Sequence, residues 1–255
     1  MGCGCGKDGK DGKDGKDNGL RVLVPPGSAV IGQRTPLDES EAHHLRVRRA
    51  GEDENVEVLD GVGLSGTGVL VRAGAKWLVE IRSAERKPSQ PELILAVAAG
   101  DRERFTWMAE KAVELGVTRL VPVETARTVG VASRIRQSHI AKLRRVVLEA
   151  TKQCGAVWAP AVEEPVSLTD FIAGSARGKG WVADPSGAAP PADLDNTPVT
   201  ILVGPEGGFS AEERKAILGA GYRPVALGLS TLRFETAALA AAAIASSARL
   251  RGNHG

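Results

Sequence analysis

The chain has 255 residues, of which 42% are hydrophobic and 25% charged, a composition typical of globular proteins with a buried core. No segment approaches the ~20 apolar residues of a membrane span or has the pattern of a signal peptide, so we expect a cytoplasmic protein without a membrane partner. The 33 Lys and Arg residues nearly balance the 31 Asp and Glu residues, so the net charge of +2 does not by itself indicate nucleic-acid binding. Three cysteines without zinc-ligand spacing predict neither a disulfide framework nor a metal.

The first 19 residues are expected to lie outside the fold. They contain four Gly-Lys-Asp triplets and no apolar run that could pack against a domain. The triplets lack the proline of a collagen helix, and Gly6 stands where N-myristoylation needs Ser or Thr. We therefore interpret residues 1–19 as a disordered leader or a tag.

Residues 20–84 have the pattern of a small β-rich domain, with short strand-like runs between Gly, Pro and Asp clusters. The expected strands are Leu20–Val24, Asn55–Leu59, Thr67–Arg72 and Trp77–Arg82. Gly61, Gly63 and Gly66 have the spacing of a dinucleotide-binding turn, but an alternating β-branched segment follows instead of a helix. A hairpin is therefore predicted there. Residues 85–91 are polar, contain two prolines and are expected to be a linker.

Residues 92–252 alternate buried strands with longer helical patterns, which indicates an α/β domain with a mostly parallel sheet. The expected strands are Leu93–Ala98, Arg119–Pro122, Gly180–Ala183, Thr200–Val203 and Pro224–Leu227. The expected helices are Arg104–Leu115, Ser133–Cys154, Ala211–Ala220 and Thr236–Leu250. The proline-rich segment Pro185–Pro198 is expected to be a long loop.

Two glycine turns near the C-terminus are the best candidates for a binding site. The sequence TILVGPEGGFSAEE places a stiff glycine turn between a buried strand and a helix, with Ser210 and Glu213 as a capping box. A second turn, at Gly228, follows another strand and leads through Arg233 and Glu235 into an alanine-rich helix, where Thr236 could act as N-cap. Open α/β sheets bind ligands at such carboxyl ends of strands. A simple strand-to-helix connection is an equally good reading of the first turn.

These motifs resemble those of a known enzyme family. VGPEGGFSAEE followed by LGLSTLRFETAA is similar to the paired motifs of SPOUT-class RNA methyltransferases, specifically the family that methylates N3 of a uridine in 16S ribosomal RNA. DRERFTWMAEKAVELGV, Thr125-Ala126-Arg127, Gln153-Cys154-Gly155 and AHHLRV resemble further signatures of that family, in the same order. The resemblance covers almost the whole chain from Leu20 to Leu250.

The resemblance implies an N-terminal PUA-like β-barrel and a C-terminal SPOUT α/β domain with a deep trefoil knot. It also implies a homodimer that binds S-adenosylmethionine between the two turns. The residues carried over as cofactor-binding are Leu202, Gly204, Glu206, Gly207, Gly208, Leu227, Gly228, Leu232, Arg233, Thr236 and Ala237, with Glu235 beside them. Two positions depart from the family pattern: Phe234 stands in place of Thr, and Ala156 in place of Arg.

The charge pattern agrees with an RNA substrate. Between Arg127 and Lys152 there are seven cations and one anion, Glu149. The candidate RNA-binding residues are Arg21, His43, His44, Arg46, Arg127, Arg134, Arg136, Arg144 and Arg145. Each patch could equally be a solvated helix face or a packed edge. Because only 4% of residues are aromatic, recognition is expected to use backbone charge and RNA shape rather than stacking.

Methyl transfer to uridine N3 needs in-line positioning and loss of the imide proton, and no metal. Arg233 is the candidate for stabilising charge on the uracil, Glu235 is a weaker candidate base, and Arg102 could position RNA or stabilise charge. Three alternatives remain open at this point. The chain could be a knotted methyltransferase for another ribosomal or transfer RNA nucleotide, a non-catalytic RNA-binding assembly factor, or, least favoured, an oxidoreductase built on Gly61–Gly66.

Overall fold

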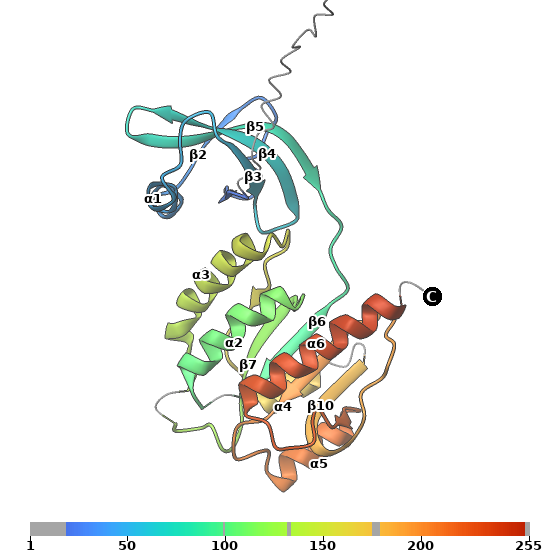
Figure 1. Ribbon diagram of the computed structural model, residues 1–255. Helices are drawn as coiled ribbons and strands as arrows, with labels where there is room; N and C mark the ends of the chain where they lie inside the picture. Colours follow the sequence, from blue (N-terminus) through green and yellow to red (C-terminus); the bar gives the residue numbers. More distant parts are fainter. Residues whose placement is uncertain (1–18, 99, 132–133, 175–178, 253–255) are drawn as a thin grey trace, which may run out of the picture.

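The computed structural model describes residues 19–98, 100–131, 134–174 and 179–252. The chain folds into two sheets with separate hydrophobic clusters, connected by the segment between strands β5 (Lys76–Arg86) and β6 (Leu93–Val97) (Figure 1). The expected leader, residues 1–19, lies outside the described residues except for Gly19.

The N-terminal half is a curled five-stranded sheet in the order β1-β3-β4-β5-β2 (Figure 1). Its other strands are β1 (Arg21–Leu23), β2 (Arg34–Pro36), β3 (Asn55–Leu59) and β4 (Leu64–Ala73). β1 is parallel to β3, and the remaining neighbours are antiparallel. Leu45, Leu70 and Ile81 are fully buried in its cluster. The expected β-rich, PUA-like first half is confirmed.

The glycine-rich segment between β3 and β4 is a hairpin, as predicted, because the two strands pair antiparallel with Leu59 opposite Ser65. Gly63 has φ +107°, and a Cβ at this position would lie 2.4 Å from the ring of Trp158. The backbone and the packing therefore both require glycine at this position. The hairpin contacts the C-terminal half of the chain, and no helix follows it that could receive a dinucleotide.

Helix α1 (Glu39–Arg48) was missed by the sequence analysis. Its N-cap is Asp38, whose side chain accepts a hydrogen bond of 2.9 Å from the backbone of Glu41. Only Glu41 and Leu45 of the helix are buried. The apolar periodicity is therefore too weak to predict the helix, and only the capping residue Asp38 indicated that a helix begins there.

The C-terminal half is a parallel sheet in the order β12-β10-β11-β6-β7-β8, with β9 also paired to β7. Its other strands are β7 (Arg119–Glu124), β8 (Ala161–Val162), β9 (Val166–Ser167), β10 (Lys179–Ala188), β11 (Val199–Val203) and β12 (Arg223–Val225). The helices are α2 (Arg102–Glu114), α3 (Gln137–Cys154), α4 (Leu168–Gly174), α5 (Ala211–Gly219) and α6 (Phe234–Gly252). The expected α/β class is confirmed.

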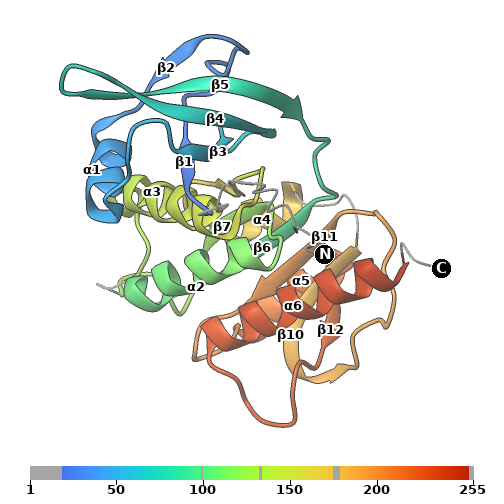
Figure 2. The same ribbon diagram turned by 45° about the horizontal axis from the view of Figure 1, so that its top comes forward.

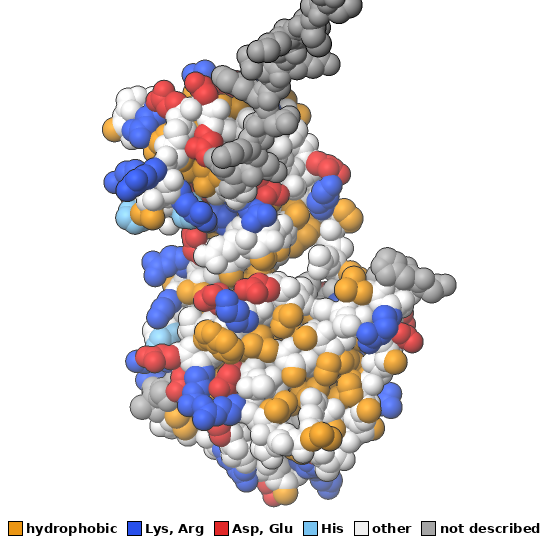
Figure 3. Space-filling view, viewed as in Figure 1, with side chains coloured by type: hydrophobic (Ala, Val, Ile, Leu, Met, Phe, Trp, Pro, Cys, Tyr) orange, Lys and Arg blue, Asp and Glu red, His pale blue; other side chains and the backbone are white. Residues whose placement is uncertain are grey.

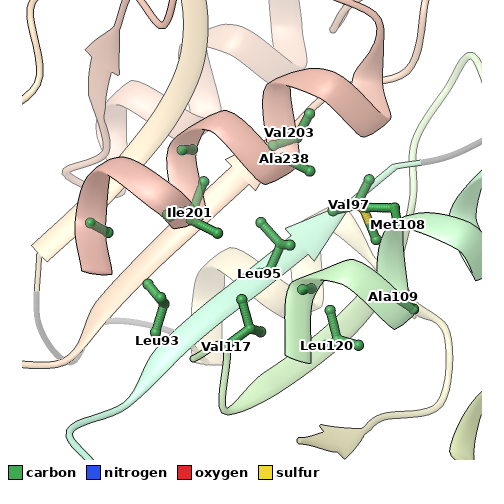
Figure 4. Packing of buried hydrophobic residues seen from close by; sticks show 14 of the residues in the cluster. Leu93, Leu95, Val97, Met108, Ala109, Val117, Leu120, Ile201, Val203 and Ala238 are labelled. Carbon is green, nitrogen blue, oxygen red and sulfur yellow. The ribbon is translucent and has the colours of Figure 1, made fainter. Parts of the chain in front are cut away.

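Helices cover both faces of this sheet, which explains why its central strands are apolar throughout. Leu93, Leu95 and Val97 of β6 point to the face covered by α2, α3 and α6 (Figures 2 and 4). The intervening Ile94 and Ala96 belong to the cluster under α4 and α5. Every residue of β6 and β11 is buried.

Several predicted boundaries were wrong, and three of them have a clear structural reason. Helix α3 begins at Gln137, because Arg136 before it is extended and donates its backbone N–H to Nδ1 of His139. His139 occupies the third position of the helix, where a capping box normally has Glu or Gln. Helix α6 begins at Phe234, so Thr236 lies within its first turn and does not cap it. Strand β10 continues through Pro185 to Ala188, and it therefore includes the start of the predicted long loop.

A buried ion pair joins the two halves of the chain. Nζ of Lys152, at the end of α3, lies 2.7 Å from Oε1 of Glu41 in α1 and 3.0 Å from Oε2 of Glu149. The side chains of Lys152 and Glu41 are 3% and 2% exposed. Burial acts to lower the pKa of Lys152, but the bonds and charges of Glu41 and Glu149 outweigh burial and raise it. The guanidinium of Arg21, in β1, donates a further hydrogen bond of 2.7 Å to the backbone carbonyl of Gln153, near the end of α3.

Replacing Lys152 tests this pair. Lys152→Met is expected to lower the free energy of unfolding by about 3–5 kcal/mol, because Glu41 would remain buried without its cation. The double variant Lys152→Met/Glu41→Leu should recover most of that loss, since neither charge remains. Urea unfolding of the three proteins measures the difference. Equal losses in the single and double variants would contradict the assignment.

Candidate functional site

The two glycine turns predicted from the sequence line a single cavity. The turn after β11 and the turn after β12 meet at the carboxyl edge of the parallel sheet, around a cavity of ≈ 160 Å³. Gly204, Gly208 and Gly228 are all in its wall. The full lining comprises Ala183, Asp184, Pro185, Val203, Gly204, Pro205, Glu206, Gly208, Phe209, Leu227, Gly228, Ser230, Thr231, Leu232, Phe234 and Ala237.

Close packing explains the glycines of the first turn. A Cβ at Gly204 would lie 3.0 Å from the ring of Phe209, and one at Gly207 would lie 3.1 Å from Cδ of Arg127. Gly208 has φ +71° and donates a backbone hydrogen bond of 2.7 Å to the carbonyl of Pro205. The turn therefore presents backbone groups and little side chain to the cavity.

The predicted capping box at the start of α5 is present, and it has an additional role. Oε2 of Glu213 accepts from the backbone N–H of Ser210 at 2.8 Å, and Oγ of Ser210 accepts from the backbone N–H of Glu213 at 3.2 Å. The other oxygen of Glu213, Oε1, accepts from the backbone N–H of Ala126 at 2.7 Å. One carboxylate therefore holds the turn that carries Arg127 against the first glycine turn.

The second turn leads directly into α6. Phe234 and Ala237 contribute to the cavity wall. Arg233 is exposed and forms no hydrogen bond or ion pair through its side chain with the described residues. Glu235 is 8% exposed, and its Oε2 atom has no hydrogen-bond partner among the described residues. Arg233 and Glu235, the two predicted catalytic residues of this turn, are therefore the sequence neighbours of Phe234, which lines the cavity.

Not every residue predicted to bind the cofactor lines the cavity. Leu202 is fully buried in the cluster under α4 and α5. Gly207, Arg233 and Thr236 are outside the lining, and Arg233 and Thr236 are exposed. The other predicted residues, Gly204, Glu206, Gly208, Leu227, Gly228, Leu232 and Ala237, are all part of the wall.

Sequence reasoning missed one acidic residue of the wall, Asp184. It directly follows the predicted strand Gly180–Ala183, and its position at the carboxyl end of a strand was the available signal. Oδ1 accepts from the backbone and the hydroxyl of Ser186 at 2.9 and 2.7 Å, and Oδ2 pairs with Arg214. Burial acts to raise the pKa of Asp184, but these partners outweigh burial and lower it. Asp184 is therefore an ionised carboxylate.

The N-terminal end of α2 borders the first glycine turn. Arg104 and Glu206 form an ion pair with a distance of 3.9 Å. NH1 of Arg102 lies 3.3 Å from Nε2 of His139, at the start of α3. The three residues predicted to be catalytic, Arg102, Arg233 and Glu235, therefore all lie in or just before the first turn of a helix.

The seven arginines among the candidate RNA-binding residues divide into two groups. Arg21, Arg46, Arg134 and Arg144 form ion pairs with Glu57, Glu39, Glu124 and Glu164, at 2.5, 2.6, 2.5 and 3.1 Å. Arg127, Arg136 and Arg145 make no side-chain hydrogen bond or ion pair with the described residues. His43 is exposed, and burial together with the charges of Lys152 and Arg48 lowers the pKa of His44.

Two features are absent from the part of the chain that the structure describes. No group of three His, Cys, Asp or Glu side chains is placed so that it could hold a metal ion. No helix of the described segments is both long and apolar enough to cross a bilayer.

Family models match most of the chain. An RNA methyltransferase domain matches residues 86–246, and an RNA methyltransferase PUA domain matches residues 37–82. Ribosomal RNA small subunit methyltransferase E of Aquifex aeolicus is 30% identical over 82% of this chain and 92% of its own length.

Solved structures of similar proteins share the fold of this chain. The corresponding enzyme of Neisseria gonorrhoeae, bound to S-adenosylmethionine, superposes with a TM-score of 0.76 at 26% identity over 88% of this chain and 95% of that chain. A Legionella pneumophila protein solved with the same cofactor bound gives a TM-score of 0.76 at 28% identity over 88% and 96%. The family models, the sequence match and the shared fold together show that this chain belongs to the ribosomal RNA small subunit methyltransferase E family.

Proposed function

We propose that the protein transfers a methyl group from S-adenosylmethionine to N3 of a uridine in 16S ribosomal RNA of the small ribosomal subunit. The observation that carries this function is the cavity formed jointly by the two glycine turns, in a chain whose relatives are small-subunit methyltransferases. A cytoplasmic location accords with such a substrate.

The cavity suits S-adenosylmethionine chemically. Val203, Phe209, Leu227 and Leu232 supply apolar surface for an adenine ring, and the glycine turns supply backbone donors and acceptors. The carboxylates of Asp184 and Glu206 give the wall negative charge that favours a sulfonium cation. A Cβ at Gly204 would press against the Phe209 ring in the same wall. We assign the cofactor to this cavity, with the residues of both turns as its walls.

The protein's contribution to the reaction is positioning and electrostatics. The cofactor supplies a methyl group that is already activated by its positive sulfur. Arg233, exposed beside the cavity wall, is placed to stabilise negative charge on a uracil carbonyl. The free Oε2 atom of Glu235 can accept a hydrogen bond, which keeps Glu235 as the candidate base.

The RNA would follow the positive surface of the molecule. Figure 3 shows Lys and Arg side chains gathered over α1, α3 and the N-terminal end of α2. Arg127, Arg136 and Arg145 have no side-chain hydrogen bond or ion pair with any residue that the structure describes and are the best candidates for phosphate contacts. Arg21, Arg134 and Arg144 also hold the fold together, so their replacement would affect stability as well as RNA binding.

We also propose the domain division and the knot that the family resemblance implies. Residues 20–84 would present RNA and residues 92–252 would carry the reaction. The two separate hydrophobic clusters support the division. The trefoil knot would enclose the segments that form the cavity.

The apolar outer face of α6 supports a homodimer. Ala243 and Leu250 are exposed on this helix, and the exposed Trp107 lies on the adjacent α2. Hydrophobic side chains form a broad patch over α2 and α6 in Figure 3. A helix that is apolar on all sides is normally buried, and a second copy of the chain would cover it.

Methylation of the proposed target can be measured directly. Incubation with labelled S-adenosylmethionine and small ribosomal subunits lacking the modification should place label on N3 of one 16S uridine. Label on a base other than uridine would contradict the proposed substrate. No labelling together with no cofactor binding by calorimetry would favour the non-catalytic assembly factor.

Gly204→Ala tests the cofactor assignment. The added Cβ pushes the ring of Phe209 towards the cavity, and overpacking of this kind should weaken S-adenosylmethionine binding by roughly tenfold. The matched control is Gly219→Ala on α5, where a Cβ meets no atom within 4 Å. Calorimetry that finds equal affinities for the two variants would remove Gly204 from the binding site.

Arg233→Ala tests the catalytic assignment. We expect kcat to fall by about 100-fold, the usual effect of losing one transition-state donor, while cofactor affinity changes little. Arg223→Ala, at an exposed position of β12, is the control. Unchanged turnover in the purified Arg233 variant would exclude this residue from the mechanism.

Ala243→Arg tests the homodimer. A charged side chain in the middle of the proposed interface should convert dimers to monomers, because its burial costs several kcal/mol. Sedimentation of the wild type, of Ala243→Arg and of the control Lys215→Gln measures the mass. A wild-type monomer at micromolar concentration would contradict the interface.

A further inference from the structure

Two hydrogen-bond donors face each other between the first turns of α2 and α3. Nδ1 of His139 accepts a hydrogen bond of 3.2 Å from the backbone N–H of Arg136. Because Nδ1 uses its lone pair in this bond, the neutral imidazole carries its proton on Nε2. That nitrogen lies 3.3 Å from NH1 of Arg102, which is also a donor. The pair therefore lacks an acceptor that would satisfy both groups.

The surroundings of this donor pair are positively charged. Residues 134–145 contain five Lys and Arg residues and no Asp or Glu. Among the described residues, no carboxylate forms an ion pair with Arg102 or Arg136. Arg102 lies between Asp101 and Glu103 in the sequence, and Oδ1 of Asp101 accepts hydrogen bonds from the backbone N–H groups of Glu103 and Arg104. An anionic acceptor is the chemical complement of this arrangement.

We propose that Arg102 and His139 form a subsite for one phosphodiester group of the RNA substrate. A phosphate oxygen can accept from Nε2 of His139 and NH1 of Arg102 together, and its charge compensates the guanidinium. A water molecule could accept both bonds but would leave the positive charge uncompensated. This inference rests on the proposed RNA substrate and adds the contact that fixes the RNA at this point.

The subsite lies close to the cofactor cavity. Arg104, two residues after Arg102 in α2, pairs at 3.9 Å with Glu206 of the first glycine turn, and Glu206 lines the cavity. The N-terminal end of α2 therefore carries the cavity contact on Arg104 and the subsite on Arg102, two positions that face different sides of the helix. Phosphate contacts of this kind set the position of RNA without reading its sequence.

Two replacements of His139 separate its two nitrogens. In His139→Asn, Oδ1 can still accept from the backbone of Arg136, which keeps the start of α3, but the donor to phosphate is lost. In His139→Gln, the longer side chain can place an amide N–H where Nε2 was. We expect His139→Asn to bind unmodified 16S ribosomal RNA roughly tenfold more weakly, and His139→Gln to retain most of the affinity.

Salt dependence identifies the charged partner. Arg102→Gln should lower the slope of log affinity against log salt by about 0.7–0.9, because one phosphate contact is lost. His139→Asn should leave the slope unchanged, because a ring that accepts a hydrogen bond at Nδ1 carries no positive charge in that form. The double variant should bind little more weakly than Arg102→Gln alone, because both side chains contact one phosphate.

Filter binding of in vitro transcribed 16S RNA at several salt concentrations gives these values. Lys215→Gln, which removes an exposed cation on α5, should change neither affinity nor slope, and calorimetry with S-adenosylmethionine confirms that each variant is folded. Wild-type affinity in His139→Asn, fully additive effects in the double variant, or an equal effect of Lys215→Gln would overturn the subsite. Failure of the wild type to bind RNA would instead contradict the proposed function.

Discussion

The site depends on the parallel pairing of β10 with β11 on one side and β12 on the other. Val182 of β10 pairs with Leu202 and Ala183 pairs with Val225, so β11 and β12 end at nearly the same level. Since parallel strands point the same way, the turns that follow them leave from one edge of the sheet. Burial on both faces fixes this register, because a slip of one residue would turn the side chains of one cluster towards the other face of the sheet. Figure 4 shows part of the cluster on the face covered by α2 and α6.

The beginning of α5 holds three separate loops in place. Glu213 forms hydrogen bonds with its own cap residue and with the backbone of Ala126, and the next residue, Arg214, pairs with Asp184 within β10. The turn with Arg127, the first glycine turn and strand β10 are therefore linked through two consecutive side chains. This linkage gives the cavity a preformed wall, which lowers the cost of ordering loops when a ligand binds.

Helix α3 connects the N-terminal half to the site. Its last turn carries Lys152, which is buried against Glu41 of α1, and its first turn carries His139, which faces Arg102. At about 1.5 Å per residue, its 18 residues span about 27 Å. A rigid element of this length holds α1 in a constant orientation to the cavity, because the buried ion pair attaches α1 to its last turn.

The sequence by itself determined the fold class, the parallel sheet, the hairpin at Gly61–Gly66 and the two glycine turns, because apolar periodicity, capping residues and glycine spacing are local signals. Helix α1 and the start of α3 escaped prediction, since one has little apolar periodicity and the other is capped by His139 in place of an acid. Only the tertiary structure showed that Asp184 lines the cavity, that Glu213 reaches Ala126, and that Arg21 and Lys152 hold the two halves together. These contacts join residues far apart in the chain, and their geometry depends on the packing of whole elements, which no local pattern encodes.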